Sequence, residues 1–133
     1  MYKRVLFALL LVVTACSGPS VKTVSQGDYR IEYNLDNGRA ELFRGDSLLF
    51  TDWTTEFNWN GKVVPNVAYS HRAWTEKAIE DQHGKGVMCE IKHSEKGLPD
   101  LLQRFYIYSS LPYILTETEL VSDTAISTEY MAP

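Results

Sequence analysis

The sequence predicts an all-β protein, an antiparallel β-sandwich, and three observations point to this fold class. Apolar side chains recur at every second position over residues 29–35, which is the period of a half-buried strand. Turn signals recur roughly every eight to twelve residues, a spacing typical of the short strands of a sandwich. Strands and helices do not alternate as they do in parallel α/β folds. We therefore expect one sandwich domain at residues 28–133, incomplete at its C-terminus.

The first 15 residues have the pattern of a lipoprotein signal peptide. Lys3 and Arg4 precede an apolar run over residues 5–13, which is about half the length needed to cross a bilayer. Small residues and then Cys16 follow directly. This arrangement resembles the lipobox of bacterial lipoproteins, which implies cleavage before Cys16 and lipid attachment to it. By the same resemblance, Ser17 favours the outer membrane. The alternative is an ordinary secretory peptide with an incidental cysteine.

Residues 16–27 are predicted to be a tether that leads into the first strand. Asn37-Gly38 and Asn60-Gly61 predict tight hairpin turns, because both residue types accept positive φ. The other strands are expected at residues 40–43, 47–50, 53–59, 63–64, 67–74, 76–80, 86–91, 103–109, 113–121 and 125–131, with a helical turn near residues 99–103. The residues expected inside are Ile31, Tyr33, Leu42, Phe57, Cys89, Ile91, Phe105 and Ile107.

Charge and cysteine content exclude two classes of protein. The net charge is -4 and Lys and Arg do not cluster, which argues against binding of nucleic acid. If Cys16 carries lipid, Cys89 is the one thiol left, so no intramolecular disulfide forms. Cys89 alternates with Val87 and Ile91, which predicts a buried structural cysteine.

The histidines give no metal-ligand pattern. Metal sites need three or four converging ligands, whereas His71, His83 and His93 lie in different segments and are expected on the surface. No metal and no cofactor are predicted.

Two groups of residues could act on sugars. Glu117 and Glu119 point to one side of a strand, roughly 7 Å apart, a separation that suits a glycosidase acid and base. A solvated sheet face is the interpretation we prefer. Trp53, Trp59 and Trp74 could form a platform for sugar rings, although aromatic side chains also fill sandwich cores.

Four segments, read in order, resemble a known family. They are residues 84–91 with a Gly-Lys-Gly turn, 101–108 with Phe105 and Tyr108, 111–115 with Pro-Tyr-Ile, and 127–133 ending in Ala-Pro. Together they resemble the N-terminal β-supersandwich of α-galactosidase-like enzymes of glycoside hydrolase family 36, including the raffinose-synthase-like branch. In that family the catalytic aspartates lie in a downstream (β/α)₈ barrel, so the resemblance assigns no catalytic residue to this chain.

Two functions are carried forward, beside the less specific possibility of a structural envelope protein that binds no ligand. The first is the non-catalytic sandwich of a lipid-anchored glycoside hydrolase that acts on α-galactoside-type sugars, with the catalytic barrel absent from this chain. The alternative is a small, complete envelope lipoprotein that binds a glycan or a protein partner through an aromatic face. In both, the membrane is contacted through the lipid anchor.

Overall fold

The computed structural model describes residue 18 and residues 20–133, which form an all-β fold. Every strand pairing in this part of the chain is antiparallel. The predicted fold class is therefore confirmed. The predicted signal peptide and the predicted lipid-attachment residue Cys16 lie outside the described residues. Within these residues, no helix has both the length and the apolar character required to span a membrane.

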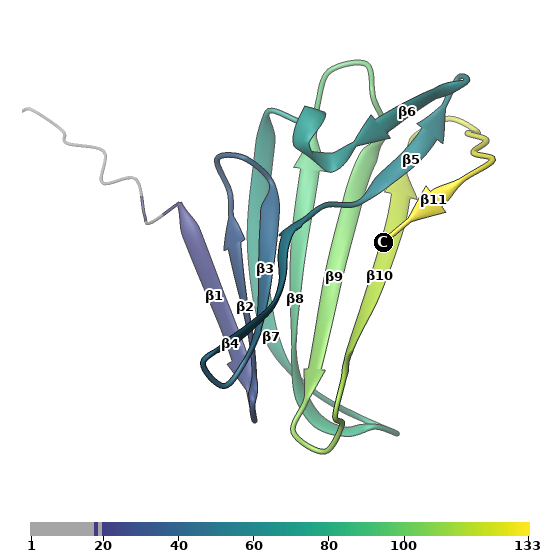
Figure 1. The fold of residues 1–133 in the computed structure, drawn as a ribbon. Helices are drawn as coiled ribbons and strands as arrows, with labels where there is room; N and C mark the ends of the chain where they lie inside the picture. The colour runs from purple at the N-terminus through teal and green to yellow at the C-terminus, as the bar shows by residue number, and fades with distance from the viewer. Residues whose placement is uncertain (1–17, 19) are drawn as a thin grey trace, which may run out of the picture.

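Two four-stranded sheets form the layers of the sandwich (Figure 1). The first sheet has the order β1-β2-β3-β4, with β1 (Val21–Gln26), β2 (Tyr29–Asn34), β3 (Arg39–Arg44) and β4 (Ser47–Trp53). The second has the order β10-β9-β8-β7, with β7 (His71–Asp81), β8 (Gly84–Ser94), β9 (Asp100–Tyr108) and β10 (Ile114–Val121).

A small third sheet lies across one end of the sandwich, at the top of Figure 1. Its order is β11-β5-β6, with β5 (Glu56–Trp59), β6 (Lys62–Pro65) and β11 (Met131–Ala132), and a 3₁₀ turn, η1 (Asn66–Ala68), follows β6. The predicted Asn-Gly turn between β5 and β6 is confirmed, because Asn60 and Gly61 have φ of 50° and 74°.

The main core lies between the two large sheets. Alternate residues of β2 and β3 meet alternate residues of β8 and β9, as period-two patterning requires. All eight residues expected inside are buried, from Ile31 at 0% to Leu42 at 4% exposure. Phe57 belongs to a second cluster with Tyr69 and Leu101, which joins the small sheet to the start of β9.

Five elements differ from the sequence-based expectation. The strand expected at residues 53–59 is divided, since Trp53 ends β4 of the first sheet whereas β5 (Glu56–Trp59) belongs to the small sheet. Strand β1 occupies part of the expected tether. The sequence does not indicate this strand, because five of its six residues are polar or exposed and only Val24 is buried. Strand β7 is continuous where two strands were expected, because it pairs with β8 along its whole length. Strand β9 replaces the expected helical turn and begins directly after Pro99. The strand expected at residues 125–131 is reduced to β11, which pairs with β5.

Candidate functional site

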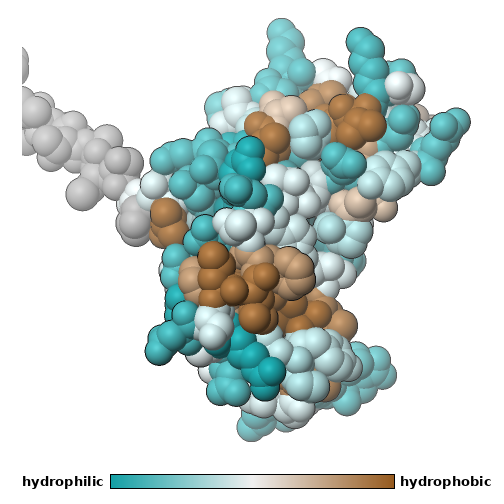
Figure 2. Space-filling view, in the orientation of Figure 1, coloured by the Kyte–Doolittle hydropathy of each residue, from teal (hydrophilic) through white to brown (hydrophobic). Residues whose placement is uncertain are grey.

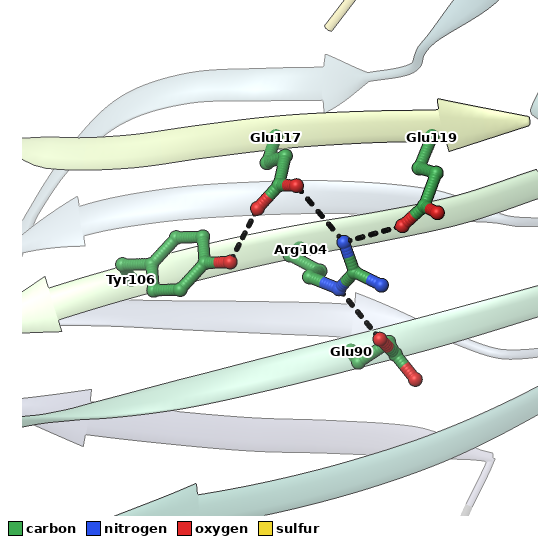
Figure 3. A network of polar contacts seen from close by, with 5 residues as sticks. All are labelled: Glu90, Arg104, Tyr106, Glu117 and Glu119. Atoms are coloured by element: carbon green, nitrogen blue, oxygen red, sulfur yellow. Dashed lines mark hydrogen bonds and ion pairs between the residues drawn. The ribbon is translucent and has the colours of Figure 1, made fainter. Parts of the chain in front are cut away.

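Glu117 and Glu119 converge on one arginine on the outer face of the second sheet (Figure 3). Glu117 lies opposite Arg104 in the β10–β9 register, and both glutamates point away from the core. Nη1 of Arg104 lies 3.0 Å from Oε1 of Glu117 and 2.8 Å from Oε2 of Glu119. The two carboxylates therefore face a shared cation and do not face each other across a space for a sugar ring.

Glu90 of β8 completes this network from the other side. Nε of Arg104 donates to Oε2 of Glu90 at 2.6 Å. The Arg104 side chain is 16% exposed, whereas those of Glu117 and Glu119 are 48% exposed. Burial alone would lower the pKa of Arg104, but its hydrogen bonds to Glu90 and Glu119 outweigh burial and raise the pKa. The guanidinium is thus a permanent positive charge that ties three neighbouring strands together.

Tyr106, two residues after Arg104 on β9, adds a further hydrogen bond to this network. Its hydroxyl donates to Oε2 of Glu117. Burial, followed by this hydrogen bond, raises the pKa of Tyr106 to about 12. The phenol therefore stays protonated at neutral pH and donates to Glu117. This hydrogen bond gives the Glu117 carboxylate a second contact with β9, beside its ion pair with Arg104.

The three tryptophans of the expected sugar platform lie in three different sheets. Trp53 of β4 packs edge-on against Phe105, with ring centroids 5.2 Å apart. Trp74 of β7 lies against Tyr33, with ring centroids 6.3 Å apart. Trp59 of β5 packs on the second core cluster. Each is half-buried. The structure brings Trp53 and Trp74 to the main core and leaves Trp59 with the other cluster, so the three rings do not share one surface.

Cys89 lies at 0% exposure in the main core, which confirms the expected burial. Burial raises the pKa of its thiol to about 12. Because the thiolate is the reactive form of cysteine, this side chain acts as a small apolar core residue at neutral pH.

The comparisons with known proteins add no relationship. No protein-family model, curated protein or solved structure matches the chain. The assignment of a function therefore depends on the residues themselves and on the resemblance that their order suggests.

A buried polar cluster escaped the sequence analysis. Tyr33, His93 and Gln103 meet Asn66 of η1 between the two large sheets, with Asn66, His93 and Gln103 each at most 2% exposed. Nδ2 of Asn66 donates to the carbonyl of Gly38 at 2.6 Å and to the Tyr33 hydroxyl at 3.2 Å. Nε2 of His93 lies 3.3 Å from Oε1 of Gln103. This cluster joins the β2–β3 turn to η1 and the second sheet.

The expected surface position of His93 is wrong, since His93 is fully buried. Two signals could have revealed the cluster. Gln103 alternates with Leu101 and Phe105, and His93 alternates with Cys89 and Ile91, so both positions belong to the inward face of their strands. His71 is exposed as expected and His83 is half-buried. Among the described residues, no group of His, Cys, Asp and Glu could hold a metal ion.

The edge strand β4 carries an apolar surface. Leu48, Leu49 and Phe50 are 51%, 45% and 59% exposed, and Figure 2 shows a hydrophobic patch over this part of the first sheet. Phe50 packs against Trp53 at a centroid distance of 5.9 Å. We call these three exposed residues of β4 the edge patch.

Proposed function

We propose that the chain is the non-catalytic β-sandwich of a lipid-anchored glycoside hydrolase that acts on α-galactoside-type sugars. In this proposal a separate barrel domain carries the catalytic carboxylates, and the sandwich supports that barrel. The sugar class comes from the family that residues 84–133 resemble. Glu117 and Glu119 form ion pairs with Arg104, which agrees with a supporting, non-catalytic role for the sandwich.

The observation that carries the supporting role is the edge patch. Edge strands of free-standing proteins are usually protected by charged residues, because their unpaired backbone groups invite association. Strand β10 has Glu117 and Glu119, and β7 has Lys77 and Glu80. By contrast, Leu48, Leu49 and Phe50 form an uncharged run on β4. We infer that the barrel domain covers this run.

Photo-crosslinking tests this contact. Benzoylphenylalanine replaces Leu49 in the chain, expressed in its native envelope, and the same group replaces Lys77 as a control on the opposite large sheet. We expect position 49, and not position 77, to yield a crosslinked peptide that mass spectrometry assigns to a (β/α)₈ barrel, on this polypeptide or on another. Products that contain only the sandwich, or equal products from both positions, would favour the free-standing lipoprotein.

Membrane attachment is a separate part of the proposal and depends on Cys16. Several acyl chains on one residue hold a protein stably, whereas one chain binds only marginally. We expect the Cys16→Ser chain to remain an uncleaved precursor or to become soluble, as mass spectrometry of membrane and soluble fractions would show. A Ser variant that is cleaved and still partitions with membranes like the wild type would exclude the lipid anchor.

A further inference from the structure

A groove lies at the end of the sandwich opposite the small sheet, where turns of both large sheets meet. Its volume is about 430 Å³, within the range of small-molecule sites. The first sheet contributes Gly27 and Asp28 of the β1–β2 turn and Arg44 at the end of β3. The second sheet contributes Tyr108 and residues 109–112 after β9.

Hydrogen bonds fix the walls of this groove. The Tyr29 hydroxyl donates to the carbonyl of Pro112, which joins the two sheets at this end. The N–H of Gly45 donates to the carbonyl of Asp28 at 2.8 Å, and the Ser110 hydroxyl donates to the carbonyl of His83 at 2.8 Å. Since these turns are held before any ligand arrives, a ligand would lose little affinity to their ordering.

Two opposite charges line the groove without pairing. Among the described residues, neither the Asp28 carboxylate nor the Arg44 guanidinium makes an ion pair or a side-chain hydrogen bond. The Arg44 guanidinium lies over the Tyr29 ring at 5.7 Å from its centroid. The arginines Arg30, Arg39 and Arg104 all have carboxylate partners. The groove is therefore lined by a carboxylate and a guanidinium, both exposed, that make no ion pair with each other or with another described residue.

We propose that this groove binds a neutral polyhydroxylated molecule, such as a monosaccharide. A hydroxyl group donates to a carboxylate and accepts from a guanidinium, so such a ligand satisfies both free charges at once. A simple anion would pair with Arg44 but leave Asp28 without a partner, in a protein of net charge -4. A simple cation would pair with Asp28 but leave Arg44 without a partner. An apolar ligand would displace water from both charged groups and offer neither of them a hydrogen bond, which is unfavourable. The inference concerns this chain alone and does not depend on the proposed hydrolase.

The test is a titration of the isotopically labelled full-length chain in mild detergent, followed by amide chemical shifts. The probes are D-galactose and D-glucose, with D-galacturonate as the anionic arm and D-galactosamine as the cationic arm. We expect a neutral sugar to shift the amides of Gly27, Asp28, Ser109 and Ser110 saturably. Asp28→Asn and Arg44→Gln should each weaken this binding by about tenfold or more.

Arg39→Gln is the matched control, because Arg39 lies at the other end of β3 and pairs with Asp52. It should bind the sugar like the wild type, and unchanged amide shifts of the core would show that all variants fold. The proposal is overturned if no neutral sugar gives a saturable shift at about 100 mM, which corresponds to negligible affinity. It is also overturned if Asp28→Asn and Arg44→Gln bind like the wild type, or if galacturonate or galactosamine binds more tightly than both neutral sugars.

Discussion

At the scale of single residues, His93 makes the stability of the protein depend on pH. Burial lowers its pKa to about 4, and the hydrogen bond with Gln103 offsets only part of this effect. Nδ1 of His93 is buried without a partner among the described residues. A proton added there would place a second positive charge near Arg72, whose guanidinium holds the carbonyls of Leu35 and Asn66.

We therefore expect stability to fall as the pH drops from about 6.5 to 4. In this window the unfolded chain takes up a proton on His93 and the folded chain does not, so the contribution of neutral His93 is complete above 6.5 and is lost toward 4. The loss should amount to about 3 kcal/mol. Urea unfolding at a series of pH values measures it.

The His93→Gln variant should show a much flatter profile between pH 4.5 and 6.5. Asp81, Glu95 and Asp100 have pKa values in the folded protein that lie below their ordinary values of 3.8 to 4.5. These carboxyl groups therefore change stability mainly below this pH window. His71→Gln is the control, because His71 is exposed on β7. An unchanged slope in His93→Gln would show that another group causes the pH dependence.

Phe105 tests how far the core depends on one side chain. It is 1% exposed and packs against Trp53 of the opposite sheet. Phe105→Ala should lower the free energy of unfolding by about 3 to 5 kcal/mol, because it removes a buried ring and leaves a cavity between the sheets. Phe43→Ala on the outer face of β3 should cost much less. Equal losses in the two variants, measured by urea unfolding, would contradict this packing.

At the scale of elements, Gly86 lies where β8 approaches β9 too closely to leave room for a Cβ atom. A Cβ atom on Gly86 would lie 2.5 Å from the carbonyl oxygen of Ile107 and 2.9 Å from Cδ1 of Tyr108. Because the nearest atom is backbone, Gly86→Ala should displace the end of β9 and cost about 1 to 3 kcal/mol. The exposed neighbour Lys85 provides the control, since Lys85→Ala should leave the thermal midpoint nearly unchanged. A Gly86→Ala midpoint equal to that of the wild type would contradict this close pairing.

Local sequence patterns predicted many of the strands and turns. They failed where pairing with another strand determines whether a strand forms or where it begins. Alternation identified β2, and Asn60-Gly61 identified the β5–β6 turn, because these signals lie within a few adjacent residues. Strand β1 was missed because an edge strand buries little, here mainly Val24. The start of β9 at Asp100 was missed because a proline precedes it, although proline is compatible with a strand beginning after it.

The candidate sites show the same division. The shared face of Glu117 and Glu119 follows from their spacing, whereas the role of Arg104 requires the β9–β10 register, which one sequence does not reveal. The groove with Asp28 and Arg44 depends on how turns from two sheets meet. No local pattern encodes that approach.

At the scale of the whole molecule, the arrangement of charges bears on catalysis. A glycosidase needs two carboxyl groups about 5 to 9.5 Å apart on either side of a bound sugar, one of them held protonated. Here Arg104 lies between Glu117 and Glu119 and Tyr106 donates to Glu117, so these groups satisfy one another on an open sheet face.

We therefore expect the chain alone to hydrolyse no glycoside. The purified full-length chain, assayed with aryl α-galactosides, should release product no faster than buffer, because the ion pairs leave Glu117 and Glu119 without a role toward a sugar. Glu80→Gln, an exposed substitution on β7, is the control. Activity from a contaminating enzyme would be the same in Glu80→Gln and in Glu117→Gln. Turnover that survives Glu80→Gln and disappears in Glu117→Gln would mean that the Arg104 network rearranges around a substrate and that the sandwich is itself an enzyme.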